Sequence, residues 1–360
     1  HAHKMDWKAA VWDVANGLRL PFARGAVPAE AGAGDPLAAL RALPALADVN
    51  IYTTRQPELI QPVMDAFTEA TGIDVNLAYV SEGIVERLKA EGRRSPADLV
   101  MTVDVASLQQ IVEAEVLQPV ESAALADAIP AHLRSPDNLW FGLTTRARIV
   151  YASKDRVADG EVTTYEDLAD PKWQGRICTR SGLHPYNLAL AAAMVAHHGE
   201  DETRVWAEGV RANLARKPEG NDRAQVKAIW AGECDISLGN TYYMGEMLKD
   251  AEQTEWANSV RIIFPTFENG GTHVNISGVA MTQAAPNKDD ALKLMEFLVS
   301  PEAQAIYAEL NNEYPVLEGA KISDLVASWG SFAADEIDLT NLASERPTAL
   351  RIMEQVNFDG

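Results

Sequence analysis

The stretch from residue 49 to residue 114 alternates short apolar runs with amphipathic segments, and this alternation constrains the fold most. Residues 49–53 and 75–80 have the length and composition of strands, and the stripe between them has helical spacing that ends at Gly72. Residues 97–103 are almost continuously apolar, as expected of a strand buried on both faces. Helical segments follow the second and third runs. The βαβαβ order predicts a doubly wound, mostly parallel α/β sheet.

A second α/β unit lies inside the first in the sequence. Two extended pieces flank residues 144–146, where the chain crosses into this unit, and an extended run at 260–265 leads back out. Two crossings predict two α/β lobes joined by a two-stranded hinge, with a cleft between them. We therefore divide the chain into an N-terminal extension (1–47), a first lobe (48–144 and 266–360) and a second lobe (145–265).

The extension at 1–47 is rich in Ala, Gly and Pro, and the sequence leaves open whether it is natural or added by cloning. Its start lacks the unbroken apolar core of a secretory signal, so we expect an exported form to have lost its signal before residue 1. No run of 18 apolar residues predicts a transmembrane helix.

The net charge of −21, from 31 basic and 52 acidic residues, excludes two classes of partner. Nucleic acids and anionic membrane surfaces both require clusters of Lys and Arg. The sequence also contains no Ser-His-Asp set, phosphate-binding loop or HExxH motif, so we expect no enzyme. We expect a monomeric binding protein.

Cys178 and Cys234 each open a candidate strand. Two neighbouring parallel strands would bring the two thiols within reach of a disulfide, which fits an oxidising compartment. Two buried free thiols are the alternative.

Three tyrosines lie where a predicted strand gives way to a helix. Tyr242 and Tyr243 follow the apolar run 234–238 and a short turn, and Tyr186 lies in the first turn after Pro185. Open α/β sheets bind ligands at such strand ends, and a helix N-terminus favours a phenolate over a phenol. The alternative is that the tyrosines are ordinary core or interface residues.

Phenolate oxygens are hard anionic donors and suit ferric iron best. Zinc prefers His and Cys, calcium prefers carboxylates and carbonyls, and soft copper prefers sulfur. Three phenolates neutralise Fe³⁺ but leave its coordination incomplete, so water or a small anion must fill the rest. A guanidinium near the strand ends or the crossing can hold a carbonate-like anion bidentately, although a surface ion pair is the simpler role for each arginine.

Seven stretches carry a resemblance to the periplasmic ferric-ion-binding proteins of bacterial ABC uptake systems. In order they are YTTRQPELIQP (52–62), SPADLVMTVD (95–104), WFGLTTRARIVY (140–151), HPYN (184–187), NTYYMG (240–245), GTHVNISGV (271–279) and EYPV (313–316). The resemblance covers about residues 49–358 and has no counterpart for the first 47. It implies a type II periplasmic-binding-protein fold that closes on Fe³⁺ and delivers it to an inner-membrane permease.

The resemblance also implies roles for individual residues. The ligand roles fall on Tyr186, Tyr242 and Tyr243. Some members of the family have a His-Tyr pair after the first strand, where this chain has Gln56-Pro57, so those two ligands are missing. The chain therefore resembles the subgroup with three tyrosines and a synergistic anion, carbonate above all, and its cysteine pair resembles that subgroup too. The anion contacts fall on Arg55, Gln56 and Arg146.

A competing hypothesis keeps the same fold but changes the solute. In a receptor for an organic anion or a polyamine, the cleft tyrosines would stack on the solute or form hydrogen bonds with it.

Overall fold

The computed structural model describes residues 48–80 and 82–360. The predicted extension at 1–47 lies outside the described residues. The strands are β1 (Val49–Thr53), β2 (Val75–Tyr79), β3 (Leu99–Thr102), β4 (Phe141–Ser153), β5 (Ile177–Cys178), β6 (Ile236–Asn240), β7 (Val260–Ile263), β8 (Val274–Met281) and β9 (Tyr314–Pro315). The α-helices are α3 (Gln61–Thr71), α4 (Ile84–Glu91), α5 (Val105–Glu113), α6 (Ala123–Ala128), α7 (Pro185–His198), α8 (Glu200–Ala212), α9 (Asp222–Ala231), α10 (Tyr242–Lys249), α11 (Thr254–Ser259), α12 (Lys288–Leu298), α13 (Pro301–Asn311), α14 (Asp324–Ser328), α15 (Leu339–Ser344) and α16 (Arg346–Gln355).

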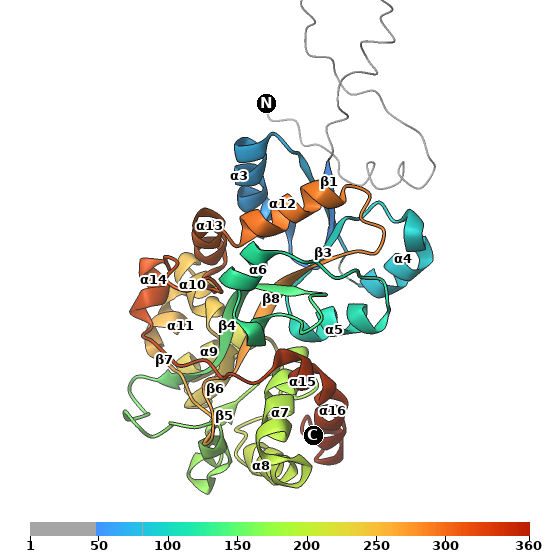
Figure 1. Ribbon diagram of the computed structural model, residues 1–360. Coiled ribbons are helices and arrows are strands. Elements are labelled where there is room, and N and C mark those ends of the chain that lie inside the picture. The colour runs from blue at the N-terminus through green and yellow to red at the C-terminus, as the bar shows by residue number, and fades with distance from the viewer. Residues whose placement is uncertain (1–47, 81) are drawn as a thin grey trace, which may run out of the picture. The chain divides into compact units, whose positions relative to one another are not determined.

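The strands form one path of hydrogen bonds in the order β2-β1-β3-β8-β4-β6-β5, with β7 and β9 also paired to β4 (Figure 1). The first three strands are parallel, as the βαβαβ pattern predicts. Strand β8 runs antiparallel to both β3 and β4. The mixed α/β architecture agrees with the predicted fold class.

Strand β4 connects the two parts of the sheet. It is 13 residues long and buried throughout. Its first half pairs with β8 and its second half with β6 and β7. The prediction of two extended pieces flanking residues 144–146 is wrong, because the strand is continuous through them. Thr144 and Thr145 pair with β9, and Arg146 lies opposite Asn275 of β8, so partners on other strands keep this segment extended.

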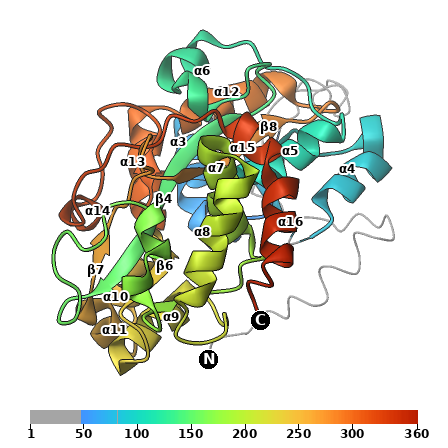
Figure 2. The same cartoon turned by 90° about the horizontal axis from the view of Figure 1, so that it is seen from below.

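The C-terminal helices lie against the middle of the chain. Helix α16 packs on α7 and α8, as Figure 2 shows from below. Beyond α16, the Asp359 carboxylate accepts hydrogen bonds from the backbone N–H of Gly182 and the hydroxyl of Ser181. The end of the chain thus fixes the loop that precedes α7. Within the described residues, no helix is long and apolar enough to cross a membrane.

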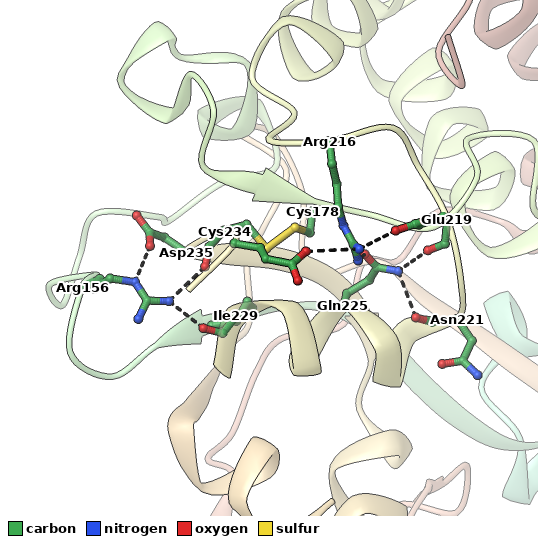
Figure 3. Close-up of a disulfide and its surroundings, with 10 residues drawn as sticks. Arg156, Cys178, Arg216, Glu219, Asn221, Gln225, Ile229, Cys234 and Asp235 are labelled. Carbon is green, nitrogen blue, oxygen red and sulfur yellow. Dashed lines mark hydrogen bonds and ion pairs between the residues drawn. A yellow bond between two sulfur atoms is a disulfide. The ribbon is translucent and has the colours of Figure 1, made fainter. Parts of the chain in front are cut away.

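Cys178 and Cys234 form a disulfide, with their Cα atoms 5.9 Å apart (Figure 3). The strands beside them, β5 and β6, are parallel neighbours, as predicted. Next to Cys234, the Asp235 carboxylate pairs with Arg156 and Arg176. The disulfide prediction is confirmed, and the bond joins the two strands whose ends lead toward the three tyrosines.

Replacing both cysteines with alanine tests what the disulfide contributes. The bond closes a loop across a sequence separation of 56 residues. Its loss should lower the free energy of unfolding by about 4 kcal/mol, mainly because the unfolded chain gains freedom. Urea denaturation of the oxidised wild type and the double variant measures this difference. A loss below about 1 kcal/mol would contradict a stabilising role.

Candidate metal centre

Tyr242 and Tyr243 are placed by a tight passage from β6 into α10. Strand β6 ends at Asn240, Thr241 precedes the helix, and Tyr242 is the first residue of the helix. The Tyr151 ring lies where a Cβ on Gly239 would be, so only glycine fits there. The Tyr151 hydroxyl donates a 2.7 Å hydrogen bond to the carbonyl of Asn240. This packing fixes the end of the strand, and the two tyrosine rings emerge with centroids 4.4 Å apart.

Tyr186 is placed by the N-terminus of α7. Pro185 occupies the first helical position, where its missing N–H costs nothing. The His184 side chain caps the helix, its Nδ1 accepting a 3.2 Å hydrogen bond from the backbone N–H of Tyr186. Burial, with the positive charge of Arg180, lowers the pKa of His184 to about 4. The imidazole is therefore neutral at pH 7 and can act as this acceptor.

The three tyrosines meet at one cavity. The Tyr242 hydroxyl donates a 3.1 Å hydrogen bond to the Tyr186 hydroxyl, and the Asn240 Nδ2 donates to the Tyr242 oxygen at 3.3 Å. The cavity measures about 520 Å³, and its lining includes the six residues to which the resemblance gives ligand or anion roles: Tyr186, Tyr242, Tyr243, Arg55, Gln56 and Arg146. Segments far apart in the sequence are thus brought together around one space.

The tyrosines are more resistant to ionisation than their helix positions predict. Burial raises the pKa of Tyr242 well above its usual value, and the neighbouring Tyr186 and Tyr243 add to the shift. Burial, with Tyr186 and Asp222, raises the pKa of Tyr243 to about 12. The expectation that the helix N-terminus favours phenolates is therefore wrong for these two residues without a ligand, because desolvation and crowding outweigh the dipole. Any cation that used these two oxygens as phenolate ligands would have to be polarising enough to displace their protons.

The residues expected to hold an anion differ in whether other side chains already bind them. Arg55 forms an ion pair with Glu313 at 2.9 Å and also donates to Ser277 and Asn311. Burial alone would lower the pKa of Arg55, but the Glu313 carboxylate raises it above its usual value. Gln56 is exposed at the rim of the cavity.

Arg146 is buried, at 3% exposure, and no carboxylate among the described residues forms an ion pair with it. Its Nη2 donates to the carbonyl of Val103, and its buried Nη1 has no hydrogen-bond partner. A buried guanidinium without a counter-charge is costly, so this side chain is suited to an incoming anion.

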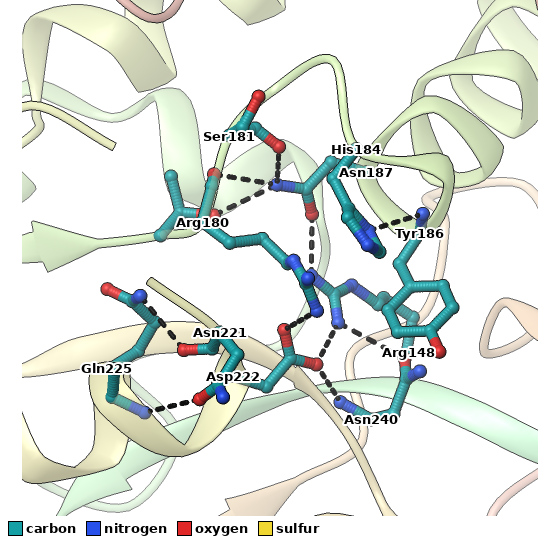
Figure 4. Close-up of polar contacts among 12 residues, drawn as sticks. Arg148, Arg180, Ser181, His184, Tyr186, Asn187, Asn221, Asp222, Gln225 and Asn240 are labelled. Carbon is teal, nitrogen blue, oxygen red and sulfur yellow. Dashed lines mark hydrogen bonds and ion pairs between the residues drawn. The ribbon is translucent and has the colours of Figure 1, made fainter. Parts of the chain in front are cut away.

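A buried network behind the tyrosines is visible only in the structure (Figure 4). Asp222, which is fully buried, pairs with Arg148 at 2.6 Å and with Arg180 at 3.1 Å. The guanidinium carbons of Arg148 and Arg180 lie 5.8 Å and 5.2 Å from the centre of the Tyr186 ring. With Arg146 included, three guanidiniums and one carboxylate surround this wall of the cavity, leaving it net positive. The local sequence around Asp222 gives no signal of these contacts.

Other metal chemistries find no support in the described residues 48–80 and 82–360. No group of three or more His, Cys, Asp or Glu side chains in these residues is arranged to hold a metal ion. His273, directly before β8, is buried, and its ring Nδ1 has no hydrogen-bond partner.

A family model of bacterial extracellular solute-binding proteins matches residues 63–334. The chain belongs to this family. One relative, the iron uptake protein A1 of Synechocystis sp., is 44% identical over 86% of this chain and 87% of its own length.

Two solved structures are similar to this member of the family over most of its length. The ferric iron-binding protein A of Mannheimia haemolytica, in an open conformation, is 48% identical with a TM-score of 0.84, covering 87% of this chain and 99% of its own. A Trichodesmium protein in complex with iron and citrate ligands is 43% identical with a TM-score of 0.84, covering 87% and 100%. The predicted type II periplasmic-binding-protein fold is confirmed, in a family of binding proteins rather than enzymes.

His273 makes the free energy of unfolding depend on pH in a testable way. Burial, with the positive charges of Arg148 and Arg146, lowers the pKa of His273 to about 3. The unfolded chain takes up this proton near pH 6.5, so the free energy of unfolding should fall as the pH drops from about 6.5 to about 3. The His273→Gln variant should show a shallower fall, measured by urea denaturation across this range. Parallel curves for variant and wild type would contradict the shift.

Proposed function

We propose that this protein binds Fe³⁺ in the periplasm through the phenolates of Tyr186, Tyr242 and Tyr243, together with a synergistic anion, and delivers it to an inner-membrane ABC permease. The observation that carries the proposal is the convergence of three tyrosines and an unpaired buried guanidinium on one cavity. The names of the relatives, which describe iron uptake and ferric iron binding, support the same cargo.

The spacing of the phenol oxygens suits a single metal ion. Two oxygens 3.1 Å apart, as in Tyr186 and Tyr242, can both lie about 2 Å from one small cation. The cation would take the place of the hydrogen bond between the two oxygens, and each phenol would release its own proton to the solvent. Because binding displaces phenol protons, affinity falls as the solution becomes more acidic.

Arg146 is the principal candidate to bind the anion. Its unpartnered Nη1 and its burial favour a charged acceptor, and the net positive wall of Arg148, Arg180 and Asp222 favours an anion over a neutral solute. The same net positive wall disfavours a polyamine, because a polyamine is a cation. Carbonate matches a guanidinium bidentately. Arg55, which is buried and already paired with Glu313, and Gln56, which is exposed, line the same cavity as further anion contacts.

Iron titration of the metal-free protein tests the proposal. Ferric citrate should produce a phenolate-to-iron charge-transfer band in the visible, and Tyr242→Phe should weaken iron binding at least tenfold because a charged ligand is lost. Tyr79→Phe is the matched control, because Tyr79 lines the same cavity but is half exposed and has no assigned role.

Two outcomes would overturn the proposal. One is the absence of any band, with the iron removed by a desalting column, and native mass spectrometry showing an organic solute instead. The other is an unchanged affinity in Tyr242→Phe. Mass spectrometry of the iron-loaded protein also identifies the anion as carbonate, citrate or another species.

We infer that two lobes close over the cavity, one formed by residues 48–144 and 266–360 and the other by residues 145–265. Helix α16 belongs to the first of these ranges but packs on α7 and α8 of the second. Gly245 of α10 contacts Asn312, the residue that ends α13, so closely that a Cβ at 245 would come within 2.4 Å of the Asn312 side chain. Gly245 thus allows the helix that carries two tyrosines to approach the opposite lobe.

Substitution at this contact should hold the lobes apart. Gly245→Ala should speed iron release about tenfold, although alanine favours the helix itself. Adding Asn312→Gly should restore slow release, because it removes the clashing side chain and glycine suits the positive φ of 51° there. Stopped-flow chelator competition measures the rates. Wild-type release in Gly245→Ala, or no rescue by the second change, would contradict this role.

A further inference from the structure

The amide of Asn240 has one possible orientation. Arg148 Nη1 can only donate, and it lies 3.1 Å from the Asn240 Oδ1. The oxygen of the amide must therefore face the guanidinium, which turns Nδ2 toward the oxygen of Tyr242 at 3.3 Å. An N–H donor is thus directed at the atom that would become an iron-bound phenolate.

The orientation of Arg148 is in turn fixed by Asp222. The carboxylate accepts from Arg148 Nη1 at 2.6 Å and from the backbone N–H of Asn240 at 3.0 Å. Arg148 Nη2 donates to Asn187 at 2.6 Å. One buried carboxylate therefore holds both the guanidinium and the backbone of the residue that the guanidinium orients.

The same carboxylate also acts on the second tyrosine. Arg148 and Arg180 both pair with Asp222, and both lie beside the ring of Tyr186. Two positive charges thus stay next to this ring when iron binding places negative charge on its oxygen. Because Arg148, Arg180 and Asn240 come from separate segments, Asp222 is the group that unites them.

We propose that Asp222 is the positioning residue of the iron site: through Arg148 it orients the Asn240 amide to donate a hydrogen bond to the Tyr242 phenolate. This inference rests on the proposed function. A donor at the phenolate oxygen lowers the energy of its lone pairs, strengthens the site against proton return, and raises the energy of the phenolate-to-iron transition.

The Asn240→Ala variant tests the hydrogen bond with a spectroscopic readout. The backbone N–H to Asp222 remains, but the amide donor is lost. The charge-transfer band should move to longer wavelength, and iron affinity should fall about tenfold or more. Thr179→Val is the matched control, because its buried hydroxyl accepts from Asn187 at 3.1 Å in the same network without touching a tyrosine. It should lower thermal stability and leave the band unmoved.

Arg148→Lys tests whether the guanidinium acts by orientation rather than by charge. Lysine keeps the charge but cannot donate to Asp222, Asn240 and Asn187 in the same fork. The band should shift as it does in Asn240→Ala. The Arg148→Lys/Asn240→Ala double variant should shift no further, because both changes remove the same hydrogen bond, that from Asn240 to Tyr242.

The outcomes separate this inference from the function it rests on. If the wild type gives no band with iron, the proposed function fails. If the wild type gives the band and Asn240→Ala leaves its position unchanged, only the positioning role fails. Additive band shifts in the double variant would also overturn the claim that Arg148 acts by orienting the Asn240 amide. Band position is read on folded, iron-loaded protein, so loss of stability alone does not mimic the expected result.

Discussion

The candidate site depends on one buried carboxylate between two guanidiniums. Asp222 has no exposure to solvent, and it pairs with both Arg148 and Arg180, as a buried carboxylate requires. Those contacts join β4, the loop after β5 and the start of α9. They also fix the positions of the side chains that contact Tyr186 and Tyr242. Removing the carboxylate would leave two buried cations unpaired, which is why the network behaves as a unit.

In the proposed site, burial keeps two of the phenols protonated until a metal ion binds. Burial raises the pKa of Tyr242 and Tyr243, so their protons stay until a trivalent cation competes for the oxygens. The surrounding wall carries more positive than negative charge, which disfavours a bare cation and favours one that arrives with an anion. The proposed selectivity for a strongly polarising ion with a small anion rests on these two opposing requirements.

Local patterns in the sequence predicted the local parts of this structure. Hydrophobic periodicity gave the parallel strands β1 to β3, and strand–helix junctions placed Tyr186, Tyr242 and Tyr243 correctly. Contacts between distant residues were not predicted: Glu313 pairs with Arg55 across 258 positions. Arg148 was not predicted as part of the site either, because its role depends on Asp222, 74 positions later. The continuity of β4 was missed because partners on β8 and β9, not local propensity, hold it extended.

Anomalous diffraction at the iron edge from crystals of the iron-loaded protein tests the central claim most directly. The account predicts one strong peak in the cavity, about 2 Å from the oxygens of Tyr186, Tyr242 and Tyr243, with a small anion between the iron and Arg146. A peak bound by other side chains, or iron distributed over the acidic surface with the Tyr242 hydroxyl still hydrogen-bonded to that of Tyr186, would contradict it.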